Sequence, residues 1–440
     1  MTVSIPTAAA EPTVSRDGYL VSRPRAWLAF AMTFLLMLLD FIDRQLVVSM
    51  FPYLKAEWAL SDKQLGALVS VVALTVGLGA LPVAVLVDRW GRVRGIFVMA
   101  AVWSLATIVC GLSGNYAQLF VARSVIGVGE AGYGPAGGAL LSSIFPARLR
   151  ATILGAFQAA AVLGSVLGVV LGGVISQHWG WQAAFGVVGV PGLILAILYL
   201  LFVRDYRTVA LVKAGDAATG AAQRIGLMGS VSELFRARSA VCAYMGGAMQ
   251  LFVVSTLYTW LPSYFNRFYD LPGDKAGTKA AIVILVSSIG AILWAYLADL
   301  LGRRQARLKM LVPAVLALMT LGILSYAFGG LPPGDTQFLL ICVGALLMTC
   351  TLGPVGSIAV DVVHPGLRAT GVSMVSLVQN LFGLAAGPFI AGVLSDTLGL
   401  QMALTIVPMF GALAALFLWI GSRSYERDLA TVERAAIRAN

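Results

Sequence analysis

The stretch Asp-Arg-Trp-Gly-Arg at residues 88–92 returns as Asp-Leu-Leu-Gly-Arg at residues 299–303, and each copy follows a long apolar run. A second pair occurs in the same order, because Leu-Arg-Ala-Thr stands at residues 149–152 and again at residues 367–370. The two pairs are separated by 211 and 218 residues in a chain of 440. This repeat predicts two halves with the same topology, as in parallel internal duplications.

The composition indicates an integral membrane protein. Hydrophobic residues make up 59% of the chain and charged residues 11%, whereas about a quarter of a soluble domain is charged. The net charge of +10 comes from basic residues in the polar gaps between apolar runs, which indicates membrane topology and argues against a nucleic-acid partner. The four cysteines fall inside apolar runs without disulfide or metal-ligand spacing, so we expect no metal site and no cofactor.

Twelve apolar runs are long enough to cross a membrane, which takes about 20 residues in a helix. They are Ala26–Met50, Gln64–Val87, Gly95–Ser113, Gln118–Ile144, Ala151–Ser176, Ala183–Val203, Ser239–Leu261, Ala280–Ala298, Met310–Gly329, Gln337–Ile358, Thr370–Leu394 and Gln401–Ile420. The predicted fold is therefore all-α and integral to the membrane, with twelve transmembrane helices in two pseudo-symmetric six-helix bundles. The expected organisation is a disordered N-terminal tail (1–25), a first bundle (26–203), a linker (204–238), a second bundle (239–420) and a C-terminal tail (421–440).

The distribution of lysine and arginine predicts the orientation. With the N-terminus inside, 23 of the 30 basic residues fall in intracellular segments, five in outside loops and two within helices. This excess places both termini and the linker in the cytoplasm. Arginine outnumbers lysine, and alanine and glycine are abundant, which favours a multi-pass protein of a bacterial inner membrane.

The repeated motif resembles the signature of the major facilitator superfamily, and the resemblance covers all twelve spans. In that family a glycine, an aspartate, a second glycine and a basic cluster follow the second helix. The leading glycine is replaced by Ala84 in the first copy and by Ala295 in the second. The family's fourth-helix pattern fits Arg123 and Gly127. In the fifth helix, the proline that the family's antiporters carry is replaced by Val169, which disfavours drug/proton antiport.

Shorter motifs resemble the Spinster-type branch of the superfamily more closely. They are Asp-Arg-Gln at residues 43–45, Gly-Val-Gly-Glu-Ala at residues 127–131, and the run from His178 to Phe185 before the sixth helix. Carboxylate symporters of other branches share parts of these motifs. The Spinster resemblance implies a lipid-like substrate, such as an amphipathic lysolipid or sphingoid-like molecule.

Five ionisable residues lie well inside predicted helices: Asp40, Asp43, Arg44, Arg123 and Glu130. A charge near the bilayer centre costs about 2.5–3.5 kcal/mol or more, so these residues are expected to face a cavity or one another. Spacing puts the first three on one face of the first helix, and the other two on one face of the fourth. We predict a protonation site at Glu130 and a first-helix aspartate, with the arginines as switchable partners. The alternative is a fixed ion-pair cluster that joins two helices.

The two copies of the repeated motif place Asp88, Arg92, Asp299 and Arg303 at cytoplasmic helix ends. We predict that these residues form an inner gate, in which acids and arginines hold the two halves closed. The alternative is a topological role, because basic residues at these positions also retain the loop in the cytoplasm.

Polar side chains within other spans are candidates for the wall of a transport cavity. The alternative for each is packing or a hydrogen bond between helices. The candidates are Tyr133, Gln158, Gln250, Tyr258, Gln379 and Asn380.

The sequence thus predicts a secondary active transporter that moves a small organic or amphipathic solute by alternating access, coupled to protons. A facilitated-diffusion uniporter and an organic-anion:proton symporter of another branch are the open alternatives, since Arg44 and Arg123 are suited to meet an anion. An ATP-driven pump is disfavoured because the sequence has no phosphate-binding loop. The buried ionisable set holds carboxylates and arginines rather than an enzyme's nucleophile and base. The expected partners are a small-molecule or lipid-like substrate, the proton and the bilayer, and we expect a monomer.

Overall fold

The computed structural model describes residues 19–203, 235–363 and 368–438, so most of the expected N-terminal tail and linker lies outside the described residues. Helices account for all regular structure in these ranges. Eleven of them, counted within the described residues, are long and apolar enough to cross a membrane. These eleven correspond to eleven of the twelve predicted spans. The remaining predicted span is the fourth, which is divided into two short helices.

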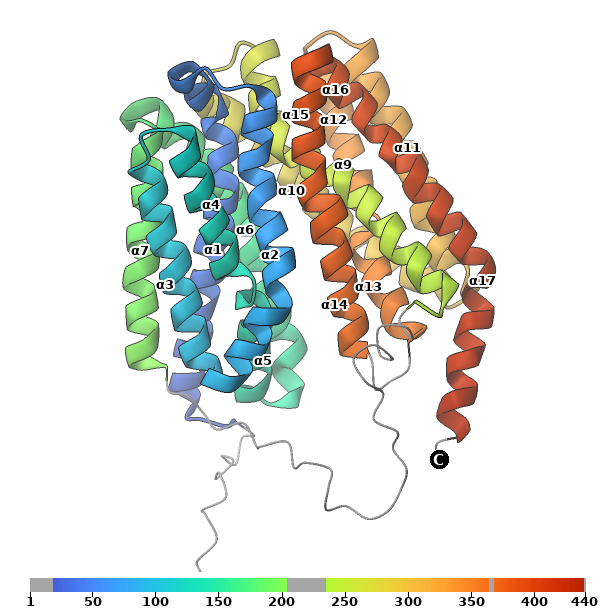
Figure 1. Ribbon diagram of the computed structural model, residues 1–440. Helices are drawn as coiled ribbons and strands as arrows, with labels where there is room; N and C mark the ends of the chain where they lie inside the picture. Colours follow the sequence, from blue (N-terminus) through green and yellow to red (C-terminus); the bar gives the residue numbers. More distant parts are fainter. Residues whose placement is uncertain (1–18, 204–234, 364–367, 439–440) are drawn as a thin grey trace, which may run out of the picture.

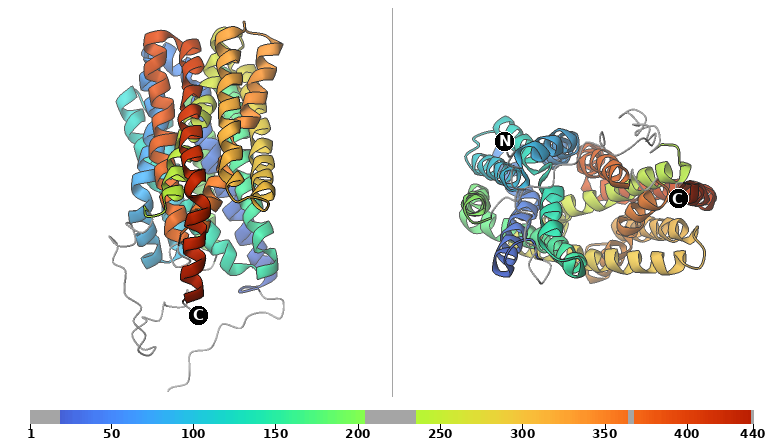
Figure 2. Two further views of the ribbon diagram at one scale, coloured as in Figure 1. Left: turned by 90° about the vertical axis from the view of Figure 1, so that its right-hand side faces the viewer. Right: turned by 90° about the horizontal axis from the view of Figure 1, so that it is seen from below.

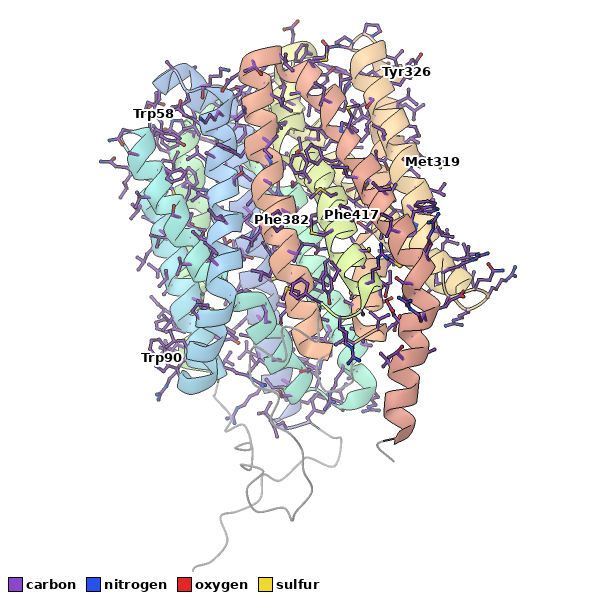
Figure 3. The ribbon with its side chains drawn as sticks, turned by 45° about the vertical axis from the view of Figure 1, so that its right-hand side comes forward. Trp58, Trp90, Met319, Tyr326, Phe382 and Phe417 are labelled. Atoms are coloured by element: carbon purple, nitrogen blue, oxygen red, sulfur yellow. The ribbon has the colours of Figure 1, made fainter. Side chains whose placement is uncertain are left out.

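The first bundle holds the helices before the linker, and its first and fifth spans run as long single helices (Figure 1). Its helices are α1 (Arg23–Trp58), α2 (Asp62–Trp90), α3 (Arg92–Gly111), α4 (Tyr116–Glu130), α5 (Tyr133–Ile144), α6 (Ala147–Trp179) and α7 (Trp181–Phe202). Trp58 and Trp90 lie at opposite ends of this bundle (Figure 3). The first span extends eight residues beyond the predicted Met50, because a proline at position 52 is accommodated inside the helix.

The second bundle repeats this order of crossings after the linker, and the two bundles lie side by side (Figure 2). Its helices are α9 (Arg238–Phe268), α10 (Gly273–Gly302), α11 (Leu308–Gly330), α12 (Asp335–Met348), α13 (Leu352–Asp361), α14 (Arg368–Val378), the π-helical turn η2 (Gln379–Ala385), α15 (Ala386–Leu398), α16 (Leu400–Ile406), the 3₁₀ turn η3 (Val407–Met409) and α17 (Phe410–Arg438). Where the C-terminal tail was expected to begin, at residue 421, the α17 helix continues to Arg438.

The fourth crossing of each bundle is broken at the same place. In the first bundle α4 ends at Glu130 and α5 begins at Tyr133. In the second bundle α12 ends at Met348 and α13 begins at Leu352. Each half-crossing is too short to span the membrane alone. The first bundle's broken crossing is therefore missing from the eleven long segments, whereas that of the second bundle is counted among them as Asp335–Asp361.

Two glycines with positive φ confirm the repeat at the turn between the fifth and sixth crossings. Gly180, between α6 and α7, has φ 84°, and Gly399, between α15 and α16, has φ 86°. A residue with a Cβ atom rarely adopts this left-handed backbone, so glycine is required at both turns. The two halves therefore share local geometry as well as helix order.

The two bundles meet tightly at one end of the molecule. We call the end where α1 begins and α17 ends the terminal end, and the other the opposite end (lower and upper in Figure 1). Near the opposite end, α6 and α10 approach so closely that a Cβ atom on Gly173 would lie 2.3 Å from the carbonyl oxygen of Gly273. A Cβ atom on Gly66 of α2 would likewise lie 2.4 Å from the Pro388 carbonyl oxygen of α15. Towards the terminal end the ribbons of α5 and α14 diverge (Figure 1).

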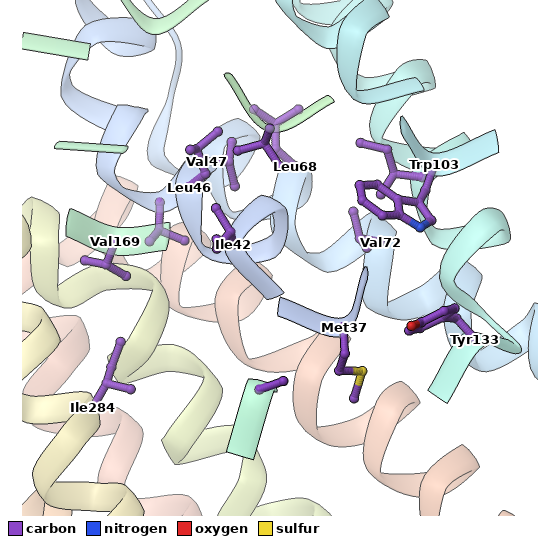
Figure 4. Packing of buried hydrophobic residues seen from close by; sticks show 14 of the residues in the cluster. Met37, Ile42, Leu46, Val47, Leu68, Val72, Trp103, Tyr133, Val169 and Ile284 are labelled. Atoms are coloured by element: carbon purple, nitrogen blue, oxygen red, sulfur yellow. The ribbon is translucent and has the colours of Figure 1, made fainter. Parts of the chain in front are cut away.

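The core of the first bundle positions α1 against α6. Buried Ile42 and Leu46 of α1 lie beside Val169 of α6 (Figure 4). Glycines that recur every fourth residue along α6, from Gly164 to Gly172, lie directly against the α1 backbone. This close packing fixes the depth of the α1 segment that carries the predicted acids.

Candidate functional site

A buried ion pair joins the first and fourth crossings of the first bundle. The Arg123 Nη1 atom lies 3.2 Å from Asp43 Oδ2, and both side chains are almost wholly buried. The Thr107 hydroxyl of α3 donates to the other carboxylate oxygen of Asp43 at 3.1 Å. Arg123 Nε also donates to the Leu68 carbonyl of α2 at 3.3 Å. Asp43 and Arg123 are therefore held by partners from four helices.

A second group of charges lies beside this pair and shares one guanidinium. Arg44 Nη2 lies 2.9 Å from Glu130 Oε2, and Arg44 Nε lies 3.6 Å from Asp40 Oδ2. Asp40 and Glu130 are buried. Glu130 Oε1 and Asp40 Oδ1 are buried without a hydrogen-bond partner among the described residues. The acids and arginines of α1 and α4 therefore lie in contact with one another, in the arrangement that the sequence predicted.

The five charges do not balance. The cluster holds three carboxylates, Asp40, Asp43 and Glu130, against two guanidiniums, those of Arg44 and Arg123. If all five groups are ionised, one negative charge is left in a buried site, where unpaired charge is costly. The Asp43–Arg123 pair is complete by itself, so the surplus belongs to the group around Arg44.

A small cavity of about 80 Å³ lies where the two bundles meet, beside this cluster. Arg44 and Arg123 line it from the first bundle, and hydroxyl groups line it from α9 of the second, where the residues are Ser255, Tyr258 and Thr259. The Arg44 side chain is 21% exposed, whereas that of Arg123 is 1% exposed. Arg44 is therefore the more accessible cation of the two to anything that enters the cavity.

The remaining cavity candidates are placed differently from one another. Tyr258 lines the cavity and is hydrogen-bonded to Ser287. The Tyr133 hydroxyl donates to the Thr33 carbonyl oxygen at 2.6 Å, so it joins α5 to α1 by an interhelical hydrogen bond, which was the alternative for this residue.

Four predicted cavity residues are absent from the lining of this cavity. Gln250 is buried and its Nε2 atom donates to the Met348 carbonyl oxygen at 3.0 Å, which is the interhelical hydrogen bond given as the alternative. Gln158 is exposed on α6. Gln379 and Asn380 begin the π-helical turn η2, and Asn380 Nδ2 donates to the Ser376 carbonyl oxygen of its own helix.

An ion cluster that the sequence motifs did not reveal closes the opposite end. Arg267 of α9 binds the Asp62 carboxylate of α2 with both terminal nitrogens, at 2.6 and 2.7 Å. Lys55 lies 2.6 Å from the same carboxylate, and the Ser395 hydroxyl of α15 also donates to it. Because Arg267 and Ser395 belong to the second bundle, these bonds join the two halves.

The N-terminus of α2 is capped from the other bundle. The Asp396 carboxylate of α15 accepts the backbone N–H groups of Asp62 and Lys63 at 2.7 and 2.9 Å. A carboxylate is favourable there because the first N–H groups of a helix have no intrahelical acceptor. We call Lys55, Asp62, Arg267, Ser395 and Asp396 the opposite-end lock. The residues are dispersed over 342 positions without a shared motif, so pairing them required the fold.

The family model of the Major Facilitator Superfamily matches residues 33–386. This chain belongs to that superfamily. It is therefore a multi-pass membrane transporter of small molecules and not an enzyme.

Three similar proteins place the chain within the superfamily. A probable L-galactonate transporter of Escherichia coli is 26% identical over 94% of both chains. Protein spinster homolog 1 of Xenopus laevis is 25% identical and matches 93% of this chain and 82% of its own. A solved bacterial homologue of the human lysosomal transporter Spinster, in an inward-facing unoccupied conformation, has a TM-score of 0.82 at 22% identity and covers 93% of this chain and 99% of its own. The resemblance to Spinster-type members of the superfamily is thus confirmed.

The signature motifs of the superfamily lie at the terminal end, where the described members bond within their own bundles. Arg92 Nη1 donates to the Ala139 carbonyl and the Ser143 hydroxyl of α5, at 3.1 and 2.9 Å. Asp299 lies 3.4 Å from Lys309 of α11, and Arg303 is exposed. The side chain of Asp88 lies outside the described residues. In this state Arg92 is thus bonded to α5 of its own bundle, and Asp299 lies beside α11 of its own bundle.

Proposed function

We propose that this protein is a proton-coupled symporter of a small organic anion, acting as a monomer in a bacterial plasma membrane. The observation that carries the proposal is the sharing of Arg44 by two buried carboxylates, Asp40 and Glu130, at the edge of a cavity between the bundles. A guanidinium in that position is suited to exchange a protein carboxylate for a substrate carboxylate, because both are bound by the same planar fork.

Charge balance supports a role for the proton. The surplus negative charge of the cluster is removed when one proton binds to Glu130 or Asp40. Arg44 then keeps a single anionic partner, so more of its hydrogen-bond donors can meet an anion in the cavity. A monoanionic substrate bound with one proton leaves a single negative charge on the cluster, whereas the same substrate without the proton leaves two, so the proton makes the loaded cluster cheaper to carry through the change of state.

The orientation follows from the basic residues of the sequence. We propose that the terminal end is cytoplasmic, since most lysines and arginines lie there. The bundles are bonded at the opposite end by Asp62 and Arg267, whereas the ribbons of α5 and α14 diverge at the terminal end. This arrangement corresponds to an inward-facing state, in which the cavity opens to the cytoplasm.

The chemistry of the cavity favours an organic acid over a lysolipid. The cavity is lined by the two guanidiniums of Arg44 and Arg123 and by three hydroxyls. These groups suit a carboxylate bearing hydroxyl groups, and the hydroxyls belong to Ser255, Tyr258 and Thr259. A relative is named for L-galactonate, a molecule of that kind. The Spinster resemblance predicts a different substrate, a lysolipid or sphingoid-like molecule. The alternative mechanism is a facilitated-diffusion uniporter, in which substrate movement is not coupled to protons.

The test is substrate-driven proton movement in proteoliposomes that contain a pH-sensitive dye. Wild type and Glu130→Gln are compared on hydroxylated and aromatic carboxylates and on lysolipids. We expect transport of a carboxylate to move protons through the wild-type protein. The Glu130→Gln variant should lose at least about 100-fold of that proton flux, which is the size of effect expected when a side chain that transfers a proton is removed.

Gln250→Leu is the matched control, because it removes a buried polar group from the second bundle at the corresponding crossing. It should retain proton-coupled flux. Carboxylate uptake without proton movement by wild type would replace symport with uniport. Proton movement driven by lysolipids alone would overturn the organic-anion substrate, and unchanged coupling in Glu130→Gln would reduce the cluster to a fixed ion-pair brace.

A further inference from the structure

A basic pocket lies far from the transport cavity, between the start of α9 and the end of α17. Its volume is about 270 Å³. Three arginines line it, Arg238 from α9 and Arg423 and Arg427 from α17, together with Ile420 and Ser424. The pocket is at the terminal end of the second bundle, where α9 begins and the apolar part of α17 stops.

The positive charge of this pocket is largely uncompensated. Among the described residues, Arg238 and Arg423 have no carboxylate within 4 Å, and Arg427 lies 3.9 Å from Asp428. The Asp428 carboxylate is engaged elsewhere, because it accepts the backbone N–H and the hydroxyl of Ser239 at 3.0 and 2.7 Å. Three guanidiniums therefore face a space that contains one carboxylate at its rim.

The level of the pocket is that of a membrane–water interface. The apolar run of α17 ends at Ile420, and charged residues follow from Arg423 onward. Trp419 is partly exposed beside the pocket, and the Arg423 guanidinium lies 3.7 Å from the centroid of its ring. Tryptophan is typical of the headgroup region, and stacking on the ring restricts the orientation of the guanidinium.

We propose that this pocket binds the phosphate headgroup of an anionic phospholipid of the surrounding membrane. The phosphate accepts hydrogen bonds from Arg238 on one helix and from Arg423 and Arg427 on the other, in the fork geometry that arginine offers to phosphates. Ile420 and Trp419 contact the start of the acyl chains. These apolar neighbours favour a lipid over a soluble anion, and basic pockets between transmembrane helices are suited to such headgroups.

The bound lipid connects the first and last helices of the second bundle. A hydrogen bond from Ser239 to Asp428 already joins α9 to α17 at this level. A phosphate between Arg238 and Arg427 adds a second connection across the same two helices. The site is independent of the proposed substrate and of proton coupling, so it stands or falls separately from the transport mechanism.

Native mass spectrometry of the full chain, titrated with cardiolipin, phosphatidylglycerol or phosphatidylcholine, tests the proposal. We expect the wild-type protein to bind the two anionic lipids more tightly than phosphatidylcholine. The double variant Arg423→Gln/Arg427→Gln should lose roughly tenfold or more of its cardiolipin affinity, because it lacks charge-assisted hydrogen bonds to phosphate. Arg238→Gln, on the other helix, should lose several-fold of its cardiolipin affinity. This variant provides a second, independent test if the double variant does not fold.

The matched control is Arg304→Gln/Arg307→Gln, which removes the same charge from exposed positions on the α10–α11 connection at the same end. Its lipid affinity should change less than about twofold, since scattered surface charges contribute little. An equal loss in the control, or no loss in the pocket variants, would overturn the proposal. Displacement of the lipid by millimolar inorganic phosphate would also overturn it, in favour of a soluble-anion site.

Discussion

The two bundles join their first and fourth crossings at corresponding levels by different chemistry. In the first bundle Asp40 of α1 and Glu130 of α4 share the guanidinium of Arg44. In the second bundle Gln250 of α9 donates a neutral hydrogen bond to the carbonyl oxygen of Met348 in α12. Both contacts lie where the fourth crossing is broken.

Sequence offsets show that these contacts correspond. Asp40 and Gln250 are 210 residues apart, the same separation as the prolines inside α1 and α9, Pro52 and Pro262. Glu130 and Met348 are 218 residues apart, which is also the separation of the two Leu-Arg-Ala-Thr stretches. A neutral pair is therefore sufficient to build this junction.

The neutral junction of the second bundle shows that the duplicated fold does not require the buried charges. Among the described residues, no charged side chain of the second bundle is buried, whereas Asp40, Asp43, Arg123 and Glu130 are buried in the first. Charges at that depth cost several kcal/mol, and the second bundle packs without them. The proposed ion coupling would explain why the first bundle carries charges that the second bundle does without.

The largest expected effect is on the stability of the first bundle. Arg123→Gln leaves the Asp43 carboxylate buried beside Thr107 without its cation, which should cost about 3–5 kcal/mol of unfolding free energy. The double variant Asp43→Asn/Arg123→Gln should recover most of that loss, because no unpaired charge remains. Thermal unfolding in detergent measures both.

Arg303→Gln is the control for this prediction, since it removes an exposed arginine from the second bundle and should change stability by about 0.5 kcal/mol or less. If Arg123→Gln were as mild as the control, the contrast between a charged and a neutral bundle would lose its energetic basis.

An intermediate effect is expected where the bundles are bonded to each other. Asp62→Asn weakens the contacts with Arg267 and Lys55, and the loss of charge-assisted hydrogen bonds corresponds to about 2 kcal/mol. Labelling of a cysteine placed at Thr259 by an impermeant reagent added from the opposite end should become roughly 30-fold faster. The background protein for this experiment lacks the four native cysteines.

Asp335→Asn is the matched control for the lock, because it removes an exposed acid at the same end from α12. Its labelling rate should equal that of the parent. Equal rates in Asp62→Asn and in the parent would show that the lock does not hold the opposite end closed.

The smallest effect is expected at the neutral junction of the second bundle. Gln250→Leu removes one hydrogen bond to Met348, and such bonds within membranes average about 0.6 kcal/mol. Asp40→Asn, at the corresponding position, should disturb proton coupling. It should change the free energy of unfolding by little more than Gln250→Leu does. Proton flux and thermal unfolding, measured on both variants, separate the two roles, and a loss of coupling in Gln250→Leu would contradict the assignment of coupling to the first bundle.

Much of the fold was predictable because hydropathy and repeated motifs act locally. Apolar length predicted all twelve crossings, and the helical spacing of Asp40, Asp43 and Arg44 placed these side chains on the face that meets Glu130. The break after Glu130 was not predictable, since the apolar run continues through it and Gly132 is one of many glycines.

The parts that sequence reasoning missed depend on contacts between distant segments. Asp62 and Arg267 are separated by 205 residues, and each reads alone as an ordinary charge at a helix end. Tyr133 was predicted as a candidate for the cavity wall, but the short helix α5 turns its hydroxyl to the Thr33 carbonyl oxygen. The break between α4 and α5, which the sequence does not show, decides which neighbour this side chain meets.

The close contact of α6 with α10 near Gly173 has a consequence for kinetics. Backbone lies against backbone there, and a Cβ atom would not fit. Because backbone meets backbone at Gly173 and Gly273, the helices can separate at this point without exchanging rotamers, so repacking there contributes little to the activation energy. The rate of opening is then governed by the electrostatic bonds around Asp62, and it should accelerate as ionic strength rises.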